Sequence, residues 1–242
     1  NNINLLLPNG QFGTRLMGGK DSASERYIFT QLNPLSKHLY NEYDSDVLNY
    51  LDDDGTPVEP EFYVPIIPMI LVNGSKGIGT GFSTEILNYN PLTLIDYIQN
   101  KISGGDLPEL IPYYDGFKGT IEKVEPNKYL ISGCYEIVKD DVIRVTELPV
   151  GMWTQDFKDH LETLMETTDK KGKKKTPLVK DYNDMSTDTL VDFTITFQSG
   201  MLNKMLSKNS NSYGTNDLVN KLKLITTKST SNLHLFDSEQ RM

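Results

Sequence analysis

The sequence is almost free of cysteine: Cys134 is the only one among 242 residues. A single cysteine forms neither an internal disulfide nor a multi-cysteine zinc site, so a reducing compartment fits best and a structural metal is not expected. The sequence also contains no run of about 18 apolar residues, and its polar start, Asn1 to Asn4, lacks the basic end and apolar core of a signal peptide. These absences argue against membrane insertion and secretion.

The sequence has no initiator Met and no element before Asn1 that could cap the fold, so we expect an internal fragment of a longer protein. Hydrophobic residues make up 37% of the chain, which is enough to bury a sizeable core. We therefore expect a globular protein of one or two domains.

Positive charge is scarce. The net charge of -9, taken alone, argues against nucleic acid, because affinity for phosphates comes mainly from Lys and Arg. The distribution of charge changes that conclusion. Residues 1–30 carry Arg15, Lys20 and Arg26 against two acidic residues, whereas residues 44–61 carry seven acidic residues and no Lys or Arg. The acidity is therefore a local patch and does not exclude DNA binding elsewhere.

The first part of the chain is punctuated by Gly and Pro. Its glycines are too dense for a helix interior, so residues 1–24 are predicted to be a loop. Apolar residues at helical spacing, interrupted by Asn33-Pro34, predict two short helical pieces over residues 26–43, with Tyr27 at or just before a helix start. The Pro-punctuated apolar run 63–72 is predicted to be buried, and its prolines disfavour a long regular strand.

The second part has clearer periodicity. A helix is predicted over residues 92–102, ending at Gly104-Gly105, and an amphipathic helix over residues 153–165. Three strand candidates separated by turns predict an antiparallel meander, and a basic loop, a fourth strand and a polar loop follow. The strands cover residues 119–124, 128–137, 142–148 and 191–197, and the loops cover residues 170–175 and 207–215. We place a domain boundary near residues 89–91.

The dipeptide Arg26-Tyr27 is chemically suited to attack on a phosphate. Free tyrosine has a pKa of about 10 and is a poor nucleophile at neutral pH. A neighbouring guanidinium stabilises phenolate character and offers planar donors to the phosphate under attack. The preceding segment, Gly18 to Ser24, supplies small residues that allow close approach of a DNA backbone, together with Lys and Ser donors. The plain alternative is a surface Arg beside a half-buried Tyr at a helix start.

Several ordered motifs around this dipeptide resemble one family. They are Asn2-Ile3-Asn4-Leu5-Leu6, Pro8-Asn9-Gly10-Gln11-Phe12-Gly13-Thr14-Arg15, Gly18-Gly19-Lys20-Asp21-Ser22-Ala23-Ser24 and Arg26-Tyr27-Ile28-Phe29-Thr30. Together they resemble the segment of eukaryotic-type (type IIA) DNA topoisomerase II that ends in its catalytic tyrosine. The likeness thins after about Gly200 and is visible before it at residues 58–63, 65–69, 72–74, 77–81, 118–122, 147–149 and 153–154.

The resemblance implies a DNA cleavage-religation core with a mixed α+β fold. Residues 1–88 would be the C-terminal part of a winged-helix-like domain that carries the catalytic tyrosine. Residues 89–242 would be an incomplete tower-like α/β domain with an antiparallel sheet.

The resemblance also implies a chemistry. In that family a homodimer cuts both strands of one duplex through covalent 5′-phosphotyrosine links, passes a second duplex through the gap in an ATP-dependent cycle, and reseals the break. By motif, Tyr27 would be the nucleophile and Arg26 its phosphate-binding neighbour. The further DNA-binding residues on this view are Arg15, Lys20, Ser22, Ser24, Lys76 and Ile86.

The segment Asn73 to Gly81 has the glycine density of a phosphate-cradling loop, but it matches neither the Walker pattern nor the full dinucleotide fingerprint. From composition alone, a tight connector under a buried segment is an equal alternative. The resemblance implies a loop along the DNA backbone that leads to Ile86, an apolar wedge between base steps. The sequence departs from the family at Phe82, usually Trp, at Glu85, usually basic or aromatic, and at Leu87, usually Pro.

No residue of this chain is assigned to a metal or a cofactor. The three histidines lie far apart in the sequence, and Asp52-Asp53-Asp54, followed by Gly55, is typical of a solvated turn. The resemblance implies Mg²⁺ and ATP in the intact enzyme, bound by domains that this chain lacks. It also implies double-stranded DNA as the partner, no membrane, and a nuclear location, or a cytoplasmic viral factory if the source is a large DNA virus.

Two other functions stay open from the residues alone. One is a non-catalytic DNA-binding or structural module in which Tyr27 is packed and inert. The other is a nucleotide-binding protein that uses Gly74 to Gly81, which a binding titration would test. On the main hypothesis, we expect the isolated chain not to relax supercoiled DNA, because it lacks the metal-binding domain, the ATPase and the main dimer contacts.

Overall fold

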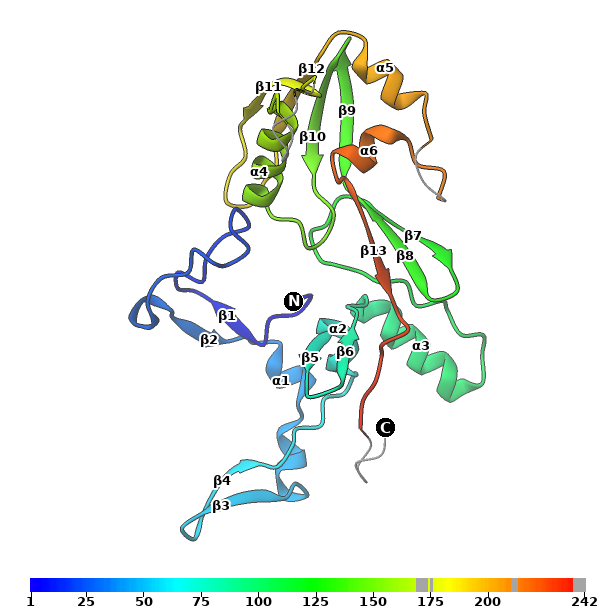
Figure 1. The fold of residues 1–242 in the computed structure, drawn as a ribbon. Helices are drawn as coiled ribbons and strands as arrows, with labels where there is room; N and C mark the ends of the chain where they lie inside the picture. Colours follow the sequence, from blue (N-terminus) through cyan, green and yellow to red (C-terminus); the bar gives the residue numbers. More distant parts are fainter. Residues whose placement is uncertain (169–173, 175, 210–212, 237–242) are drawn as a thin grey trace. The chain divides into compact units, whose positions relative to one another are not determined.

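The computed structural model describes residues 1–168, 174, 176–209 and 213–236 of the chain. The chain divides into two compact units, whose elements are labelled in Figure 1. Unit 1 comprises residues 1–10, residues 28–115 and the chain from Thr230 onward, and unit 2 comprises residues 11–27 and 116–229.

This division does not follow the boundary predicted near residues 89–91, because unit 1 continues to Asp115 and unit 2 takes in the segment that ends at Tyr27. The assignment of winged-helix-like and tower-like domains stays a prediction. Both units combine helices with antiparallel sheets, which confirms the predicted mixed α+β class. Among the described residues, no helix is long and apolar enough to cross a membrane.

Unit 1 is built from short helices and two-stranded antiparallel sheets. The sheets pair β1 with β2, β3 with β4, and β5 with β6. In chain order its elements are β1 (Leu6–Pro8), β2 (Thr30–Leu32), α1 (Ser36–Leu39), the 3-10 helix η2 (Glu42–Asp46), β3 (Tyr50–Asp53), β4 (Thr56–Pro60), α2 (Met69–Asn73), β5 (Ser75–Ile78), β6 (Ser83–Ile86) and α3 (Pro91–Ser103).

The start of the chain is tied into unit 1 by one amide side chain. The Asn2 amide nitrogen lies 2.9 Å from the Val72 carbonyl oxygen and 3.0 Å from the carbonyl oxygens of Tyr89 and Tyr113. Its amide oxygen accepts a hydrogen bond of 2.9 Å from the Asp115 backbone N–H. Because these partners are far apart in the sequence, Asn2 holds α2, the chain after β6 and residues 113–115 together.

Helix α3 is the part of unit 1 that the sequence predicted best. The Asn90 side chain accepts a hydrogen bond of 2.9 Å from the Leu92 N–H, and Pro91 occupies the first turn, where its missing N–H needs no partner. Gly104 ends the helix with φ 74°, a left-handed conformation that glycine adopts without strain. The predicted helix and its stop are confirmed.

Other predictions for unit 1 were wrong. Residues 26–43 contain the strand β2 as well as short helical pieces. This strand forms because it pairs with β1, which lies in the segment 1–24 that was predicted to be a loop. The run 63–72 is only partly buried: Tyr63 is 60% and Ile66 64% exposed, whereas Val72 is fully buried in α2. Because the run is apolar throughout, its sequence does not show which of its positions are exposed and which are buried.

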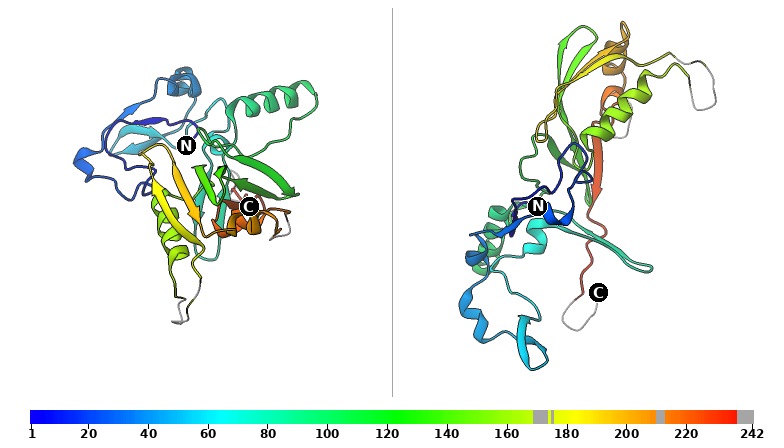
Figure 2. Two further views of the ribbon diagram at one scale, coloured as in Figure 1. Left: turned by 90° about the horizontal axis from the view of Figure 1, so that it is seen from above. Right: turned by 90° about the vertical axis from the view of Figure 1, so that its left-hand side faces the viewer.

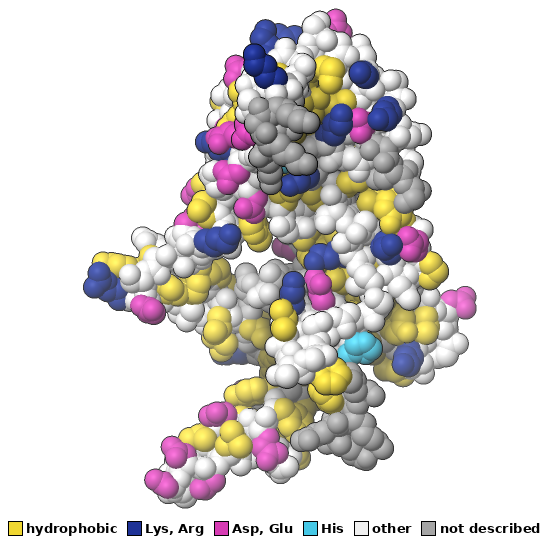
Figure 3. Space-filling view, viewed as in Figure 1, with side chains coloured by type: hydrophobic (Ala, Val, Ile, Leu, Met, Phe, Trp, Pro, Cys, Tyr) yellow, Lys and Arg dark blue, Asp and Glu magenta, His cyan; other side chains and the backbone are white. Residues whose placement is uncertain are grey.

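The predicted solvated turn after Asp52-Asp53-Asp54 is confirmed as the turn of the β3–β4 hairpin. Asp54 and Gly55 have φ angles of 51° and 85°, as two-residue hairpin turns require, and the Gly55 N–H donates 2.9 Å to the Asp52 carboxylate. Figure 3 shows the arm of residues 42–61 with acidic and hydrophobic side chains and no basic ones on the face in view. The acidic patch therefore lies on one arm of unit 1.

The predicted glycine-rich loop at residues 74–81 is instead most of a β-hairpin, a long thin ribbon in the right-hand view of Figure 2. Gly74 permits this geometry, because a Cβ there would approach the Asn88 side-chain oxygen to 2.7 Å. The Glu85 N–H donates 3.0 Å to the Asn232 carbonyl oxygen, so the late segment of unit 1 runs along β6.

Unit 2 is organised around two antiparallel sheets. Their strand orders are β11-β12-β10-β9 and β13-β8-β7. In chain order its elements are the 3-10 helix η1 (Glu25–Tyr27), β7 (Thr120–Glu125), β8 (Lys128–Ser132), β9 (Cys134–Lys139), β10 (Val142–Glu147), α4 (Thr154–Met165), β11 (Val179–Asp184), β12 (Phe193–Phe197), α5 (Met201–Leu206), α6 (Asp217–Lys221) and β13 (Ile225–Ser229). The basic run predicted at residues 170–175 lies outside the described residues except for Lys174.

The predicted single meander was wrong, because the strand candidate 128–137 breaks at Gly133 into β8 and β9, which belong to different sheets. A Cβ on Gly133 would overlap the carbonyl oxygen of Glu147, the last residue of β10. Only glycine at position 133 therefore allows the end of β10 to contact the chain between β8 and β9. The Gly133 N–H donates 2.8 Å to the Leu224 carbonyl oxygen, just before β13. Strand β13, far along the chain, then completes the second sheet.

The core of unit 2 confirms the predicted amphipathic helix at residues 153–165. Phe157 and Leu161 of α4 are fully buried, and the Phe157 and Phe193 rings meet edge to face with centroids 5.1 Å apart. Burying such a side chain contributes about 1.5–3 kcal/mol. Figure 1 shows α4 beside β11 of the larger sheet. The predicted strand at residues 191–197 is also confirmed, as β12.

We predict that Gly133→Ala lowers the free energy of unfolding of unit 2 by about 1–3 kcal/mol, because the added methyl group must displace the Glu147 carbonyl oxygen. Urea unfolding followed by the fluorescence of Trp153, the only tryptophan and part of unit 2, measures this change. Gly105→Ala, whose Cβ would make an ordinary contact of 3.8 Å with Asn100, lies in unit 1 and should leave the unfolding of unit 2 unchanged. Unfolding of Gly133→Ala at the same urea concentration as the unaltered protein would contradict the prediction.

Candidate active site at Tyr27

Tyr27 lies at the end of a segment that closes on itself, residues 11–27, which we name the tyrosine loop. The Tyr27 N–H donates 2.9 Å to the Ser24 carbonyl oxygen in the η1 turn. The Gln11 N–H donates 3.0 Å to the Tyr27 carbonyl oxygen, and the Ala23 N–H donates 3.0 Å to the Gln11 carbonyl oxygen. Tyr27 therefore ends a 3-10 turn. The prediction that it lies at or just before a helix start was wrong.

The Tyr27 side chain is open to a large partner, with 44% of it exposed. The guanidinium carbon of Arg26 lies 5.0 Å from the centroid of the Tyr27 ring, within the range of a cation–π contact. The structure thus brings the two predicted catalytic residues together, with the positive charge next to the phenol. An exposed phenol beside a guanidinium suits attack on an anionic phosphate.

Three predicted DNA-binding residues share the tyrosine loop with Tyr27. The side chains of Lys20, Ser22 and Ser24 are all exposed. The loop backbone that carries them is bonded to itself: the Gly19 N–H donates 3.1 Å to the Thr14 carbonyl oxygen, and the Ser22 N–H donates 3.2 Å to the Gly19 carbonyl oxygen. The loop therefore presents one ammonium and two hydroxyl groups to solvent on an ordered backbone.

Asp21 organises this loop, and sequence reasoning missed it. One carboxylate oxygen accepts 2.9 Å from the Thr14 N–H, and the other accepts 2.6 Å from the Thr14 hydroxyl. The hydrogen bond from the Thr14 hydroxyl, followed by that from its N–H, holds the pKa of Asp21 below its ordinary value of 3.8. Gly13, with φ 89°, allows the close approach, because a Cβ there would lie 2.7 Å from the Gly19 Cα. No signal in the sequence singled out Asp21, because the same segment also carries Glu25.

Arg15, also predicted to bind DNA, has its guanidinium paired with the Glu147 carboxylate. The Arg15 side chain is 28% and the Glu147 side chain 1% exposed. The Glu147 carboxylate also accepts 2.9 Å from the Leu148 N–H and 3.2 Å from the Lys118 N–H. Residues 147–149 carry part of the family resemblance, but sequence reasoning gave Glu147 no role at the site, because it lies more than a hundred residues from Arg15.

The remaining two predicted residues lie in unit 1, on the β5–β6 hairpin. Lys76 is exposed and faces Glu85 across the hairpin. Ile86 is only 4% exposed at the base of the hairpin, where it pairs with Ser75. The apolar side chains open to solvent on this hairpin are Ile78 near its tip, 84% exposed, and Phe82, 69% exposed.

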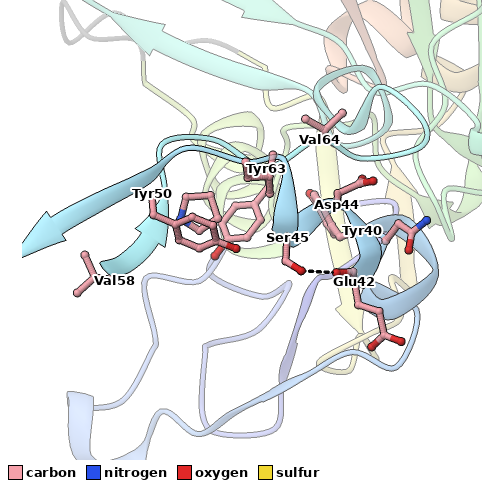
Figure 4. A pocket seen from close by; sticks show the side chains of 11 residues that line it. Tyr40, Glu42, Asp44, Ser45, Tyr50, Val58, Tyr63 and Val64 are labelled. Carbon is pink, nitrogen blue, oxygen red and sulfur yellow. Dashed lines mark hydrogen bonds between the residues drawn. The ribbon is translucent and has the colours of Figure 1, made fainter. Parts of the chain in front are cut away.

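Unit 1 also contains a pocket of about 350 Å³ that none of the predicted site residues lines (Figure 4). The Tyr40 and Tyr63 rings in its wall meet edge to face, with centroids 5.8 Å apart. The Ser45 hydroxyl donates 2.6 Å to the Glu42 carbonyl oxygen, the contact dashed in Figure 4. Because the wall combines tyrosines with acidic residues and has no Lys or Arg, the pocket does not fit a phosphate.

The residues that the structure describes do not form a magnesium site. In the part of the chain that the structure describes, no group of three or more His, Cys, Asp or Glu side chains could hold a metal ion. The His160 ring nitrogen Nε2 donates a hydrogen bond of 2.7 Å to the Lys221 carbonyl oxygen, and burial lowers the pKa of His160. We therefore derive no chemical step through a metal in this chain.

Comparison with known proteins gives one consistent result. The family model for the A subunit of DNA gyrase/topoisomerase IV matches residues 1–242. DNA topoisomerase 2 of Pisum sativum is 45% identical over 240 residues, which are 99% of this chain and 16% of that protein. DNA topoisomerase 2 top-2 of Caenorhabditis elegans is 49% identical over 206 residues, 85% of this chain and 13% of that protein.

A solved structure is similar along the whole chain. It is the crystal structure of the Plasmodium falciparum topoisomerase II DNA-binding, cleavage and re-ligation domain, with a TM-score of 0.88 and 41% sequence identity. The match covers 100% of this chain and 31% of that one. The chain thus spans a small part of the proteins it matches.

We predict that the Asp21 carboxyl titrates with a midpoint below 3.8, and that the Thr14 amide proton follows the same titration. A lowered pKa in the folded loop means that the Thr14 contact is complete above the ordinary pKa and is lost as the pH falls through the lowered one. Thr14→Val removes the hydroxyl donor and should move the midpoint back toward 3.8. NMR titration of both residues measures it, and a midpoint unaffected by Thr14→Val would contradict the assignment.

Proposed function

The chain belongs to the DNA gyrase/topoisomerase IV family, and from this premise we propose that it is the part of a type II topoisomerase that cleaves and rejoins DNA. The observation that carries the proposal is the exposed Tyr27 phenol, set beside the Arg26 guanidinium at the end of a closed loop. The similarity to a solved topoisomerase II cleavage domain supports it.

In the proposed reaction, the Tyr27 oxygen attacks a phosphorus atom of the DNA backbone. A bond forms between that oxygen and phosphorus as the bond to the 3′ oxygen of the neighbouring nucleotide breaks. The phenol proton leaves, the 3′ oxygen takes up a proton, and the broken strand stays linked to Tyr27 through its 5′ phosphate. The reverse reaction reseals the strand without ATP, because one phosphodiester has been exchanged for another.

The neighbouring residues support this reaction through charge and hydrogen bonds. The Arg26 fork would donate to the non-bridging oxygens, where charge develops during the attack. Lys20, Ser22 and Ser24, and Lys76 on the β5–β6 hairpin, would contact backbone phosphates, which position DNA without reading its sequence. DNA contact by Arg15 and Ile86 stays a prediction, because Arg15 is paired with Glu147 and Ile86 is buried.

The remaining parts of the proposal concern the longer protein. Because the chain spans 16% of DNA topoisomerase 2 of Pisum sativum, we place magnesium and ATP in parts outside these residues. The intact protein would be a homodimer that cuts both strands of one duplex, passes a second through the gap, and reseals it in an ATP-dependent cycle. We propose the nucleus as its location, in keeping with its eukaryotic relatives.

We predict that Tyr27→Phe, in the longer protein with magnesium, abolishes covalent linkage to DNA and leaves DNA binding nearly unchanged, because only the attacking oxygen is removed. Arg26→Lys keeps the charge but loses the planar fork, so adduct formation should fall by about 10²-fold, as when one preorganised donor is lost. Denaturant-trapped adducts on end-labelled duplex DNA measure both effects.

The matched control is Tyr43→Phe, which alters a tyrosine that is 80% exposed and lies outside the proposed site. It should form adducts at the rate of the unaltered protein. Adducts that persist in Tyr27→Phe would refute the proposed nucleophile. The absence of any adduct on this chain in the unaltered protein would favour the alternative function, a non-catalytic module with an inert Tyr27.

A further inference from the structure

The tyrosine loop is fastened to the body of unit 2 at several points that the proposed chemistry does not use. The Arg15 guanidinium pairs with Glu147, and the Arg15 N–H donates 3.3 Å to the Asp188 carbonyl oxygen. The Leu16 carbonyl oxygen accepts 2.9 Å from the Gln155 N–H in the first turn of α4. These contacts connect the loop to the end of β10, to the chain between β11 and β12, and to the first turn of α4.

Among the residues that attach the loop, Glu147 has a side chain whose position is fixed by its surroundings. It ends strand β10, is 1% exposed, and has its carboxylate held by the backbone N–H groups of Leu148 and Lys118. A buried carboxylate needs a cation, because leaving it unpaired is strongly unfavourable. Arg15 supplies the cation from the tyrosine loop.

The loop also lies against the only tryptophan of the chain. Gly18 has φ 62°, and a Cβ there would overlap the Trp153 indole, so the loop backbone is in direct contact with the ring. Trp153 precedes α4, whose Gln155 N–H would otherwise be one of the unsatisfied donors of a helix start. The indole is therefore a natural reporter of whether the loop is in place.

We propose that Glu147 is a positioning residue for the reaction: through Arg15 it holds the tyrosine loop against Trp153 and so fixes where Tyr27 meets the DNA phosphate. This inference rests on the proposed function of Tyr27. Arg15 then acts by fastening the loop and not by contacting phosphate.

The loop can transmit this constraint to Tyr27, because its turns are bonded to one another. The Thr14 carbonyl oxygen, next to Arg15, accepts from the Gly19 N–H, and Gln11 is bonded to both Ala23 and Tyr27. A shift of Arg15 therefore moves the whole loop. Displacement of a reacting group by about 1 Å is enough to slow a reaction by about 10²-fold.

The test compares Glu147→Gln and Gly18→Ala with Arg144→Met as the control. Arg144 also lies on β10 and pairs with Asp192, but its side chain is 45% exposed and does not touch the tyrosine loop. Acrylamide quenching of Trp153 in this chain, which has no other tryptophan, measures docking of the loop. In the longer protein, the rate of adduct formation at saturating DNA and the Kd for DNA measure the chemical consequence.

We expect Glu147→Gln and Gly18→Ala to increase the quenching of Trp153 and to slow adduct formation at saturating DNA by about ten- to a hundredfold, with the Kd for DNA changed less than about twofold. Arg144→Met should change none of these. If Glu147 acts through Arg15, the double variant Arg15→Met/Glu147→Gln should be no slower than the slower of the two single variants, Arg15→Met and Glu147→Gln.

Unchanged quenching in both variants, or increased quenching with an unchanged rate, would overturn the proposal. A weaker Kd with an unchanged rate at saturation would do so as well, and would return Arg15 to the DNA-contact residues. If Glu147→Gln does not fold, the double variant Arg15→Met/Glu147→Gln decides in its place, because it removes both members of the pair and leaves neither charge unpaired. Failure of the proposed function is distinguishable: adducts would persist in Tyr27→Phe while the quenching of Trp153 still responded.

Discussion

The buried carboxylate of Glu147, paired with the Arg15 guanidinium, is the interaction on which the rest of unit 2 depends. Glu147 ends β10, and its backbone carbonyl lies against Gly133, where the chain leaves one sheet for the other. The sheet, the backbone at Lys118 and the tyrosine loop therefore meet at one charge. The Glu147 side chain is 1% exposed, and a buried charge must keep its ion pair and hydrogen bonds. The positions of the sheet, the Lys118 backbone and the tyrosine loop therefore restrict one another.

This constraint gives the chemistry of Tyr27 a physical basis. A nucleophile that attacks a polymer backbone must be exposed, yet an exposed side chain on a loose loop would have to be ordered at the moment of reaction. The tyrosine loop combines both requirements, since the Tyr27 side chain is 44% exposed while its backbone is bonded to Ser24 and Gln11. Arg26 places positive charge beside the ring without burying it.

The sequence predicted the elements whose signals are local. Helix α3 has its own cap, first-turn proline and terminal glycine, and α4 shows its buried face through its spacing. It failed where pairing is long-range, as for β1 with β2 and for the strand candidate that splits at Gly133 between two sheets. It also failed at the local hairpin β5–β6, because its density of glycines is more typical of a loop than of strands. The same distinction holds for the site. Tyr27 and Arg26 were found from a contiguous motif, whereas Glu147 is joined to the loop only by folding.

The measurement that tests the central claim most directly is identification of the amino acid that carries DNA. The covalent adduct of the longer protein would be trimmed with nuclease and protease, and the nucleotide-bearing peptide sequenced by tandem mass spectrometry. The account predicts one modified peptide, from the tyrosine loop, with the nucleotide on the oxygen of Tyr27. A nucleotide on any other residue, such as Tyr40 or Tyr63 of unit 1, would contradict it.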